Sequence, residues 1–337
     1  MTVHELDTPF QLPRPDIEIL KTSREDLQHQ INTLSDIYLP VLREKLLDLK
    51  VELSTVDDST LHALTVIAPL LVNDGLPDLL DAIVALRGQE VSDEVAEAIA
   101  GLTDELRVQI GEGLTRVRDH AQNLDNSLTN LRAASFREVR FLIEPLSQEA
   151  TTLDDRLTAQ QTRLDDLVTQ ESAVNKLIAD VESITWIDRL LPLVKSLEKL
   201  AEIDPKNPLI GSIKAGLEGL KNILNLANDQ IKYANLIDLR GNLQEQLDGL
   251  RSTLRDLKER RDDVGIKLKQ LRGVEALDVP KGVYLEEIGK LLEALRRFLI
   301  GSVATTEEDI VAYASRFINH SQVLSDYLNE LRREWRT

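Results

Sequence analysis

The chain has no cysteine, only 4% aromatic residues and just 15 glycines among 337 residues. The lack of cysteine excludes disulfides and thiolate metal sites. Few aromatic residues together with 29% charged residues are typical of long helices packed side by side, rather than of two globular domains. No segment alternates apolar and polar residues with β-branched enrichment, so no substantial sheet is expected. We therefore predict an all-α fold.

Positive charge is also scarce. The chain has 40 lysines and arginines against 58 acidic residues, which gives a formal net charge of −18 at pH 7. Binding to phosphate backbones requires a basic stripe, and this sequence does not supply one. Nucleic acid is therefore excluded as a partner, and adsorption of the whole chain to an anionic membrane is disfavoured.

Signals for export and membrane insertion are missing from the sequence. Residues 1–15 have neither a basic region nor an apolar run, so no classical secretory signal is visible. No charge-free run of about 18 apolar residues occurs, so no constitutive transmembrane helix is expected. If the protein reaches a membrane, it must refold or oligomerise from a soluble form.

Motifs of catalysis and metal binding are absent too. The five histidines have no partner at the i+3 or i+4 spacing of helical metal ligands: His4, His29, His62, His120 and His320. The sequence contains no P-loop, no GxGxxG and no GxSxG motif. Adjacent acids such as Asp154-Asp155 and Asp262-Asp263 are interpreted as solvated helix faces. We predict a protein that is not an enzyme and has no metal site and no cofactor.

The first quarter of the chain predicts an extended arm followed by helices. Prolines block helix formation in residues 1–14. Apolar residues at seven-residue spacing predict a helix from Asp16 to Leu53, with a possible kink at Pro40 and a break at Asp57–Ser59. The apolar stretch Leu61–Leu86 predicts two short helices around a turn. We interpret this stretch as a buried end-cap of a bundle, with a second membrane-touching element as the alternative.

The rest of the chain carries a coiled-coil pattern. It predicts a very long helix from Ser92 to Leu200, with a bend near Phe136–Pro145. A return helix follows, with its seam at Leu236, Leu243, Leu250, Leu257, Val264 and Leu271. We expect a loop at Gly273–Gly282, a helix at Tyr284–Ile300, and a last helix opened by the capping box Thr305-x-x-Glu308.

These elements predict an elongated rod of long antiparallel helices. A four- to five-helix bundle forms its tail, a coiled coil its neck, and an amphipathic helical hairpin its head. The predicted division is an arm at 1–14, a tail and neck at 15–183 and 237–337, and a head at 184–236. A head of two helices has few neighbours to cover its apolar faces, and such exposed patches usually mark a partner or membrane site.

Both arms of the predicted head carry an apolar stripe, and they meet at a turn at Asp204–Pro208. The stripes contain Trp186, Ile187, Leu190, Leu193, Val194, Leu197 and Ala201 in the first arm, and Leu209, Ile213, Leu217, Leu220, Leu224 and Ala227 in the second. Trp186 fits an interfacial anchor and a core residue equally well. The second arm also has a polar stripe, which contains Lys214, Glu218, Lys221 and Asn225. The head is close to neutral, whereas the whole chain is strongly acidic.

The order of these parts, together with the opening Leu12-Pro13-Arg14-Pro15-Asp16-Ile17, resembles the B component of the alpha-xenorhabdolysin family of binary cytolysins. That family is similar in design to the cytolysin A-like α-pore-forming toxins. The resemblance covers nearly the whole chain.

The resemblance implies a soluble component that is released without a classical signal peptide and acts at the host cell membrane. It implies pairing with an A-component subunit, assembly into a hetero-oligomeric ring on the target-cell lipid membrane, and insertion of the head hairpin. The membrane-inserting residues would be Trp186, Ile187, Leu190, Leu191, Leu193, Val194, Leu197, Leu200, Pro208, Leu209, Ile210, Ile213, Leu217, Leu220, Ile223 and Leu224.

The charges on the head are compatible with insertion only in an assembly. A charge at the centre of a bilayer costs a few kcal/mol, so several charges on one hairpin would oppose insertion of a single copy. In a ring, the polar stripe Lys214, Glu218, Lys221 and Asn225 would line a pore lumen while the opposite face contacts lipid. The alternative from the residues alone is a coiled-coil tether or scaffold whose mid-chain hairpin docks a protein partner.

Overall fold

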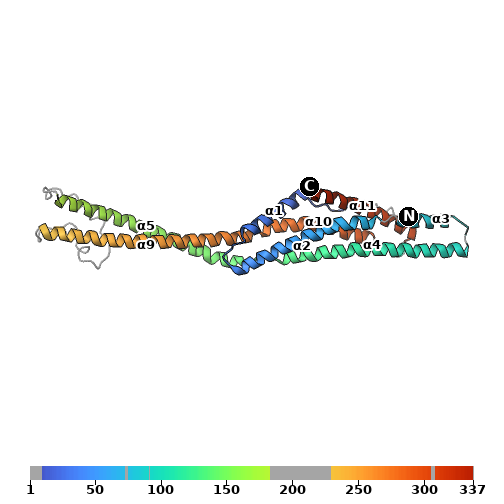
Figure 1. Cartoon of the computed structure of the whole chain (residues 1–337), viewed down its shortest axis with the longest axis horizontal. Helices are drawn as coiled ribbons and strands as arrows, with labels where there is room; N and C mark the ends of the chain where they lie inside the picture. Colours follow the sequence, from blue (N-terminus) through green and yellow to red (C-terminus); the bar gives the residue numbers. More distant parts are fainter. Residues whose placement is uncertain (1–9, 73–74, 91, 183–228, 305–307, 337) are drawn as a thin grey trace, which may run out of the picture. The chain divides into compact units, whose positions relative to one another are not determined.

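The computed structural model describes residues 10–72, 75–90, 92–182, 229–304 and 308–336 (Figure 1). Within these residues every regular element is a helix and none is a strand, which confirms the predicted all-α fold. The chain divides into two compact units: a first unit of Met1–Arg140 with Gln270–Thr337, and a second unit of Phe141–Lys269.

The first unit is a helical bundle. Its helices are α1 (Ile17–Thr33), α2 (Pro40–Leu71), α3 (Gly75–Arg87), α4 (Asp93–Ala133), α10 (Asp278–Gly301) and α11 (Ile310–Arg336). Helix α2 packs against α4 and α11, α1 against α10, and α3 against α4 and α11. Side-chain caps mark two of the helix starts, because Asp16 accepts from the Ile19 amide at 3.1 Å and Ser92 accepts from the Val95 amide at 3.2 Å.

Large apolar side chains from five helices fill the core of the first unit. They include Leu20 and Leu27 of α1, Leu49 and Ile67 of α2, Leu124 of α4, Tyr284 and Phe298 of α10, and Phe317 of α11, all below 2% exposed. Two contacts show that α2 and α4 run antiparallel. Ser59 shares a hydrogen bond with Ser127 at 2.9 Å, and Lys45, nearer the start of α2, pairs with Glu138 just beyond the end of α4.

The predicted first helix, Asp16 to Leu53, is wrong in its extent. Helix α1 ends at Thr33, and Pro40 is the first residue of α2, where its missing N–H breaks no hydrogen bond. The predicted break at Asp57–Ser59 is also wrong, because α2 continues to Leu71. Asp57 does not cap a helix; its carboxylate accepts a hydrogen bond from the Tyr284 hydroxyl across the bundle.

The predicted uninterrupted helix from Ser92 is wrong, although the predicted bend is correctly located. Helix α4 ends at Ala133, and α5 begins at Val139 and has Pro145 in its interior. The break lies before the proline, at residues 134–138. Phe136, within the break, packs into the core and is 3% exposed. The buried Lys281 donates to the carbonyl of Ala134 at 2.5 Å, which satisfies an acceptor that the helix end leaves open.

The predicted loop at Gly273–Gly282 is also wrong. Helix α9 continues to Ala276 and α10 starts at Asp278, so Pro280 lies in a first turn, where proline is tolerated. Gly273 lies against Leu34, whose Cδ2 would be 3.0 Å from a Cβ at that position. This close approach explains a glycine within the helix.

The last helix begins later than the predicted capping box. Helix α11 starts at Ile310, and the Asp309 carboxylate accepts from the Val311 amide at 3.0 Å. Glu308 instead pairs with Arg316 at 2.6 Å. The other half of the box, Thr305, lies outside the described residues.

The apolar stretch predicted as an end-cap packs into the first unit. Leu64 and Ile67 of α2 and Leu76 and Ile83 of α3 are buried, in agreement with the end-cap interpretation. By length and composition the stretch Pro40–Arg87 passes the test for a membrane span, with 38% of its most apolar window buried, and no other described stretch does. Core helices of soluble proteins can have the same length and composition, so this finding alone does not assign a membrane span.

Candidate functional site

Two antiparallel helices flank the predicted head. They are α5 (Val139–Glu182) and α9 (Asp229–Ala276), and in the second unit they form what we call the stem. Gln244 donates to Glu171 at 3.1 Å, and Arg261 donates to Asp154 at 2.9 Å. The two pairs are 17 residues apart on both helices, so the stem keeps one register between them. That register brings the end of α5 level with the start of α9, so residues 183–228 begin and end at the same end of the stem.

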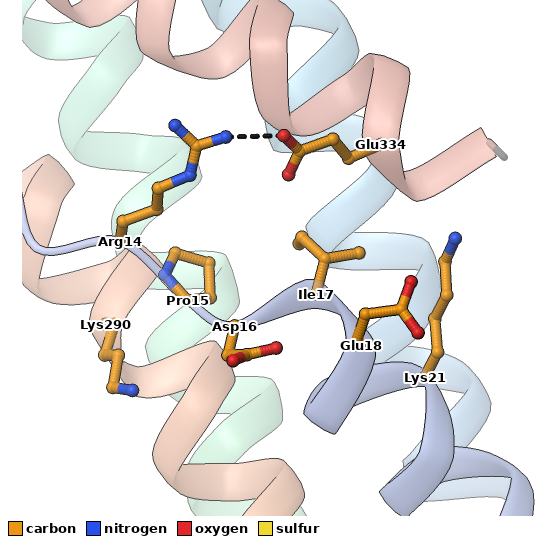
Figure 2. Close-up of a pocket in the computed structure, with 8 residues that line it drawn as sticks. All are labelled: Arg14, Pro15, Asp16, Ile17, Glu18, Lys21, Lys290 and Glu334. Carbon is orange, nitrogen blue, oxygen red and sulfur yellow. Dashed lines mark hydrogen bonds and ion pairs between the residues drawn. The ribbon is translucent and has the colours of Figure 1, made fainter.

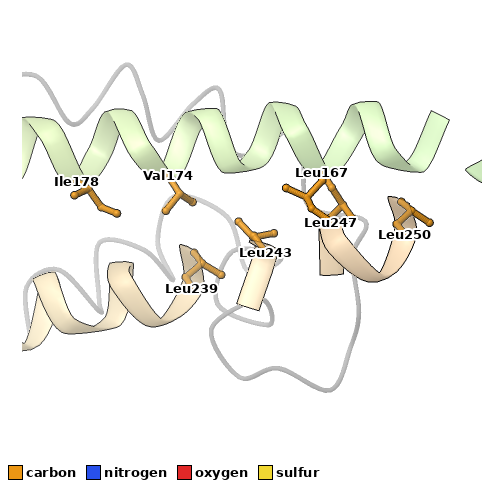
Figure 3. Packing of buried hydrophobic residues seen from close by; sticks show 7 residues of the cluster. All are labelled: Leu167, Val174, Ile178, Leu239, Leu243, Leu247 and Leu250. Atoms are coloured by element: carbon orange, nitrogen blue, oxygen red, sulfur yellow. The ribbon is translucent and has the colours of Figure 1, made fainter. Parts of the chain in front are cut away.

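The part of the stem that is nearest the predicted head in sequence has its own apolar core, which we call the head-side cluster (Figure 3). Its side chains project from α5 and α9 toward one another: Leu167, Val174, Ile178, Leu239, Leu243, Leu247 and Leu250. All are at most 8% exposed. The predicted seam positions Leu243 and Leu250 are confirmed as buried, and Leu239 is a further buried position within the same predicted seam.

A second, smaller cluster lies farther down the stem. Leu153, Val264 and Leu268 are buried there, with Leu146 and Leu257 packed against them. Ion pairs between the helices lie beside this cluster: Arg260 with Glu149 at 2.5 Å, and Arg261 with Asp154 at 2.9 Å. The hydrogen bond with Asp154 raises the pKa of Arg261. Both partners are about half exposed, so Asp154 belongs to a solvated helix face, as predicted.

The predicted site residues themselves lie outside the described residues. The apolar residues from Trp186 to Leu224 and the polar stripe from Lys214 to Asn225 all belong to residues 183–228. Their assignment to lipid or to a pore lumen therefore stays a prediction. The stem on which they are carried is described up to Glu182 and again from Asp229.

Sequence reasoning did not single out Gln170, which is 8% exposed on α5. Its side-chain nitrogen has no hydrogen-bond partner among the described residues. The signal that would have identified it is a polar residue three positions after the seam residue Leu167, where the next buried position falls.

The first unit has an open cleft of about 670 Å³ where the N-terminal arm meets α1 (Figure 2). It is lined by Arg14, Pro15, Asp16, Ile17, Glu18, Lys21, Lys290 and Glu334. Its basic groups are largely committed to the chain's own acids: Arg14 pairs with Glu330 and Glu334, and Lys290 pairs with Glu287. The Arg14 pairs fasten the arm to α11, and the Asp16 amide donates to Glu287 of α10 at 2.6 Å, so we interpret the cleft as an anchor for the arm and not as a ligand site.

No protein-family model matches the chain, and no curated protein matches it. Solved structures do match, over nearly its whole length. PaxB from Photorhabdus luminescens is similar with a TM-score of 0.71 and 16% identity, covering 97% of this chain and 98% of PaxB. A chain of the XaxAB pore complex from Xenorhabdus nematophila gives 0.70 and 17% identity, covering 96% and 99%. The crystal structure of XaxB from Xenorhabdus nematophila gives 0.68 and 16%, again covering 96% and 99%.

At sequence identities of 16–17%, the similarity shows a shared fold. It extends over both units and across the stem, and it includes a structure solved as a pore complex. The predicted resemblance is thereby confirmed at the level of the fold, because the chain has the fold of PaxB and XaxB.

Proposed function

We propose that the protein is the B component of a two-part α-pore-forming cytolytic toxin. The soluble monomer pairs with an A-component subunit, the pairs assemble as a hetero-oligomeric ring on a target-cell membrane, and the hairpin within 184–236 inserts to form the pore. The observation that carries this proposal is the fold shared with PaxB and with the XaxAB pore complex, together with the apolar sequence of the segment that joins α5 to α9.

The stem supports a transfer of the hairpin as one element. Among the described residues, two cross-helix pairs keep α5 and α9, which flank residues 183–228, in one register. The buried side chains of the head-side cluster all come from α5 and α9, outside residues 183–228. We infer that the two arms would leave the stem together and enter a membrane together while α5 and α9 stay paired.

The charges of the hairpin support insertion from an assembly rather than from a monomer. Lys214, Glu218 and Lys221 recur on one face of the second predicted arm. In an isolated hairpin they would meet lipid at a cost of a few kcal/mol each. In a ring the same face would line water, which makes pairing and oligomerisation the step that permits insertion.

Dye release from liposomes tests the proposal. The protein is mixed with a candidate A component, and the double variant Leu217→Asp/Leu220→Asp is compared with the wild type. Each aspartate would add about 3 kcal/mol to insertion, so the release rate should fall at least about 100-fold. Binding to the A component in solution should persist, because the substitutions lie in the predicted head.

A matched control carries the same two charges on the first unit. Leu47 and Val51 are 57% and 61% exposed on α2, so Leu47→Asp/Val51→Asp should leave dye release within a few-fold of the wild type. If the liposomes do not leak with the A component, or if charges in the hairpin leave leakage unchanged, the tether function replaces the toxin. In that case Leu217→Asp/Leu220→Asp would abolish binding of a protein partner.

A further inference from the structure

Two histidines from different helices face each other in the first unit. His62 of α2 and His120 of α4 have ring centroids 5.0 Å apart and ring planes inclined at 60°. They lie at the contact of the two helices, beside the hydrogen bond between Ser59 and Ser127. Neither histidine has a role in the proposed pore function.

We propose that His62 and His120 together bind a divalent transition-metal ion of the zinc class, and that the ion links α2 to α4. Imidazole nitrogen suits Zn²⁺, Ni²⁺ and Cu²⁺, and the site would take Zn²⁺ in a tetrahedral arrangement. The proposal rests on the geometry of this pair and does not depend on the proposed toxin function.

The separation of the rings fits a shared ion. With a metal–nitrogen distance of about 2.0–2.1 Å, each ring centroid lies about 3.2 Å from the metal. At a tetrahedral angle, two such rings have centroids about 5.2 Å apart. The observed separation of 5.0 Å differs from this by less than the rotation of one side chain would change it.

The ring nitrogens are available for coordination. Among the described residues no side chain or carbonyl forms a hydrogen bond or an ion pair with either imidazole. His62 is exposed and His120 is half-buried, so an ion can enter from solvent. The site would therefore stay open to solvent on the side of His62, unlike metal sites whose ligands enclose the ion.

Water would complete the coordination shell. The described residues contain no group of three or more His, Cys, Asp or Glu that could hold a metal ion. Two imidazoles and water form an open site, which binds more weakly than the closed four-ligand sites of structural zinc. Asp58, one helical turn before His62, and Asp119, next to His120, are exposed acids that favour a cation nearby.

The sequence does not reveal this site, because the spacing patterns of metal ligands apply to two ligands on one helix. His62 and His120 belong to different helices, and only the antiparallel packing of α2 on α4 brings them together. No spacing rule within one helix reports such a pair.

Thermal unfolding of the full chain without an affinity tag tests the site. Zn²⁺ at about ten times its dissociation constant should raise Tm by roughly 3–6 °C, because the ion binds only the folded bundle. His62→Gln and His120→Gln should each abolish the shift. His29→Gln, an exposed histidine of α1, is the matched control and should keep it.

Cobalt provides an independent readout. Co²⁺ added to the wild type and to His29→Gln should produce the visible absorption of a tetrahedral site, and this absorption should be missing from His62→Gln. A Zn²⁺-induced Tm shift as large in His62→Gln and His120→Gln as in the wild type would overturn the proposal. Failure of Zn²⁺ and Co²⁺ to bind the wild type in titration calorimetry would overturn it as well.

Discussion

The Tyr284 hydroxyl donates a hydrogen bond to the Asp57 carboxylate at 2.7 Å, and Arg24 approaches the same oxygen at 3.8 Å. Tyr284 is fully buried. Burial raises the pKa of Asp57, and burial together with the neighbouring carboxylate raises the pKa of Tyr284 far above its usual value. This contact joins α2 to α10, and it shows that a carboxylate at the predicted helix break serves as a hydrogen-bond acceptor inside the bundle.

Tyr284→Phe should destabilise the protein by about 1.5–3 kcal/mol at pH 7, because a largely buried carboxylate loses its donor. The loss should shrink as the pH approaches the range where Asp57 is protonated. A raised pKa means that the folded state takes up a proton before the unfolded state does, so acidification removes the penalty of the buried charge. Urea unfolding at pH 7 and at about pH 4.5 measures both values.

Tyr313→Phe is the control for that prediction. The Tyr313 hydroxyl donates to the carbonyl of Ser302 at 3.3 Å, a neutral acceptor, so its loss should be smaller and equal at both pH values. A Tyr284→Phe variant whose stability falls equally at both pH values would mean that Asp57 is not the group that requires the hydroxyl.

The core of the stem is formed by fewer helices than the core of the first unit. Among the described residues, the buried side chains of the head-side cluster come from only two helices, α5 and α9. The helices of the first unit each contact two or more neighbours. One truncation in the stem therefore removes a larger share of the contacts that hold its element than a truncation in the bundle does.

Leu247→Ala should open the stem locally. Leu247 is 1% exposed, and removing a buried leucine side chain costs about 2–5 kcal/mol. Hydrogen exchange should accelerate in α5 and α9 around the head-side cluster, while protection in α2 and α4 stays unchanged. Leu47→Ala, at an exposed leucine of α2, should change neither region. Equal acceleration in both units would show that they unfold together and would contradict this assignment.

The elements were predictable where the apolar repeat was long, and their ends were not. The repeat of Leu243, Leu250 and Val264 gave the return helix and its buried face correctly. Pro40 and Pro280 were misread because a proline fits a kink, a loop or a first turn equally well, and only packing chooses among them. For the same reason the cross-helix pair of His62 and His120 had no signature along the chain.

Among the described residues, the two units have separate apolar cores. The first unit buries aromatic residues such as Phe298 and Phe317, whereas the stem buries chiefly leucine, isoleucine and valine along one seam. The fold was predicted from the sequence because it follows from the order of long amphipathic helices. The candidate site was predicted only as a segment, since its residues lie outside the described part of the chain.

Scanning calorimetry should resolve two thermal transitions, with the stem melting before the first unit because it buries less apolar surface per residue. Leu247→Ala should lower only the first transition, and Tyr284→Phe only the second. A single transition that both substitutions shift equally would contradict the division into two cores.

The register of the stem has a consequence for how such proteins vary in length. Glu171 meets Gln244 and Asp154 meets Arg261 without slippage. An insertion in α5 alone would rotate its seam away from α9, whereas equal insertions in both helices, in steps of seven residues, would preserve every contact. The pairing of the two helices thus couples their lengths. Relatives with a longer or shorter stem should differ by the same number of heptads in both helices of the coiled coil.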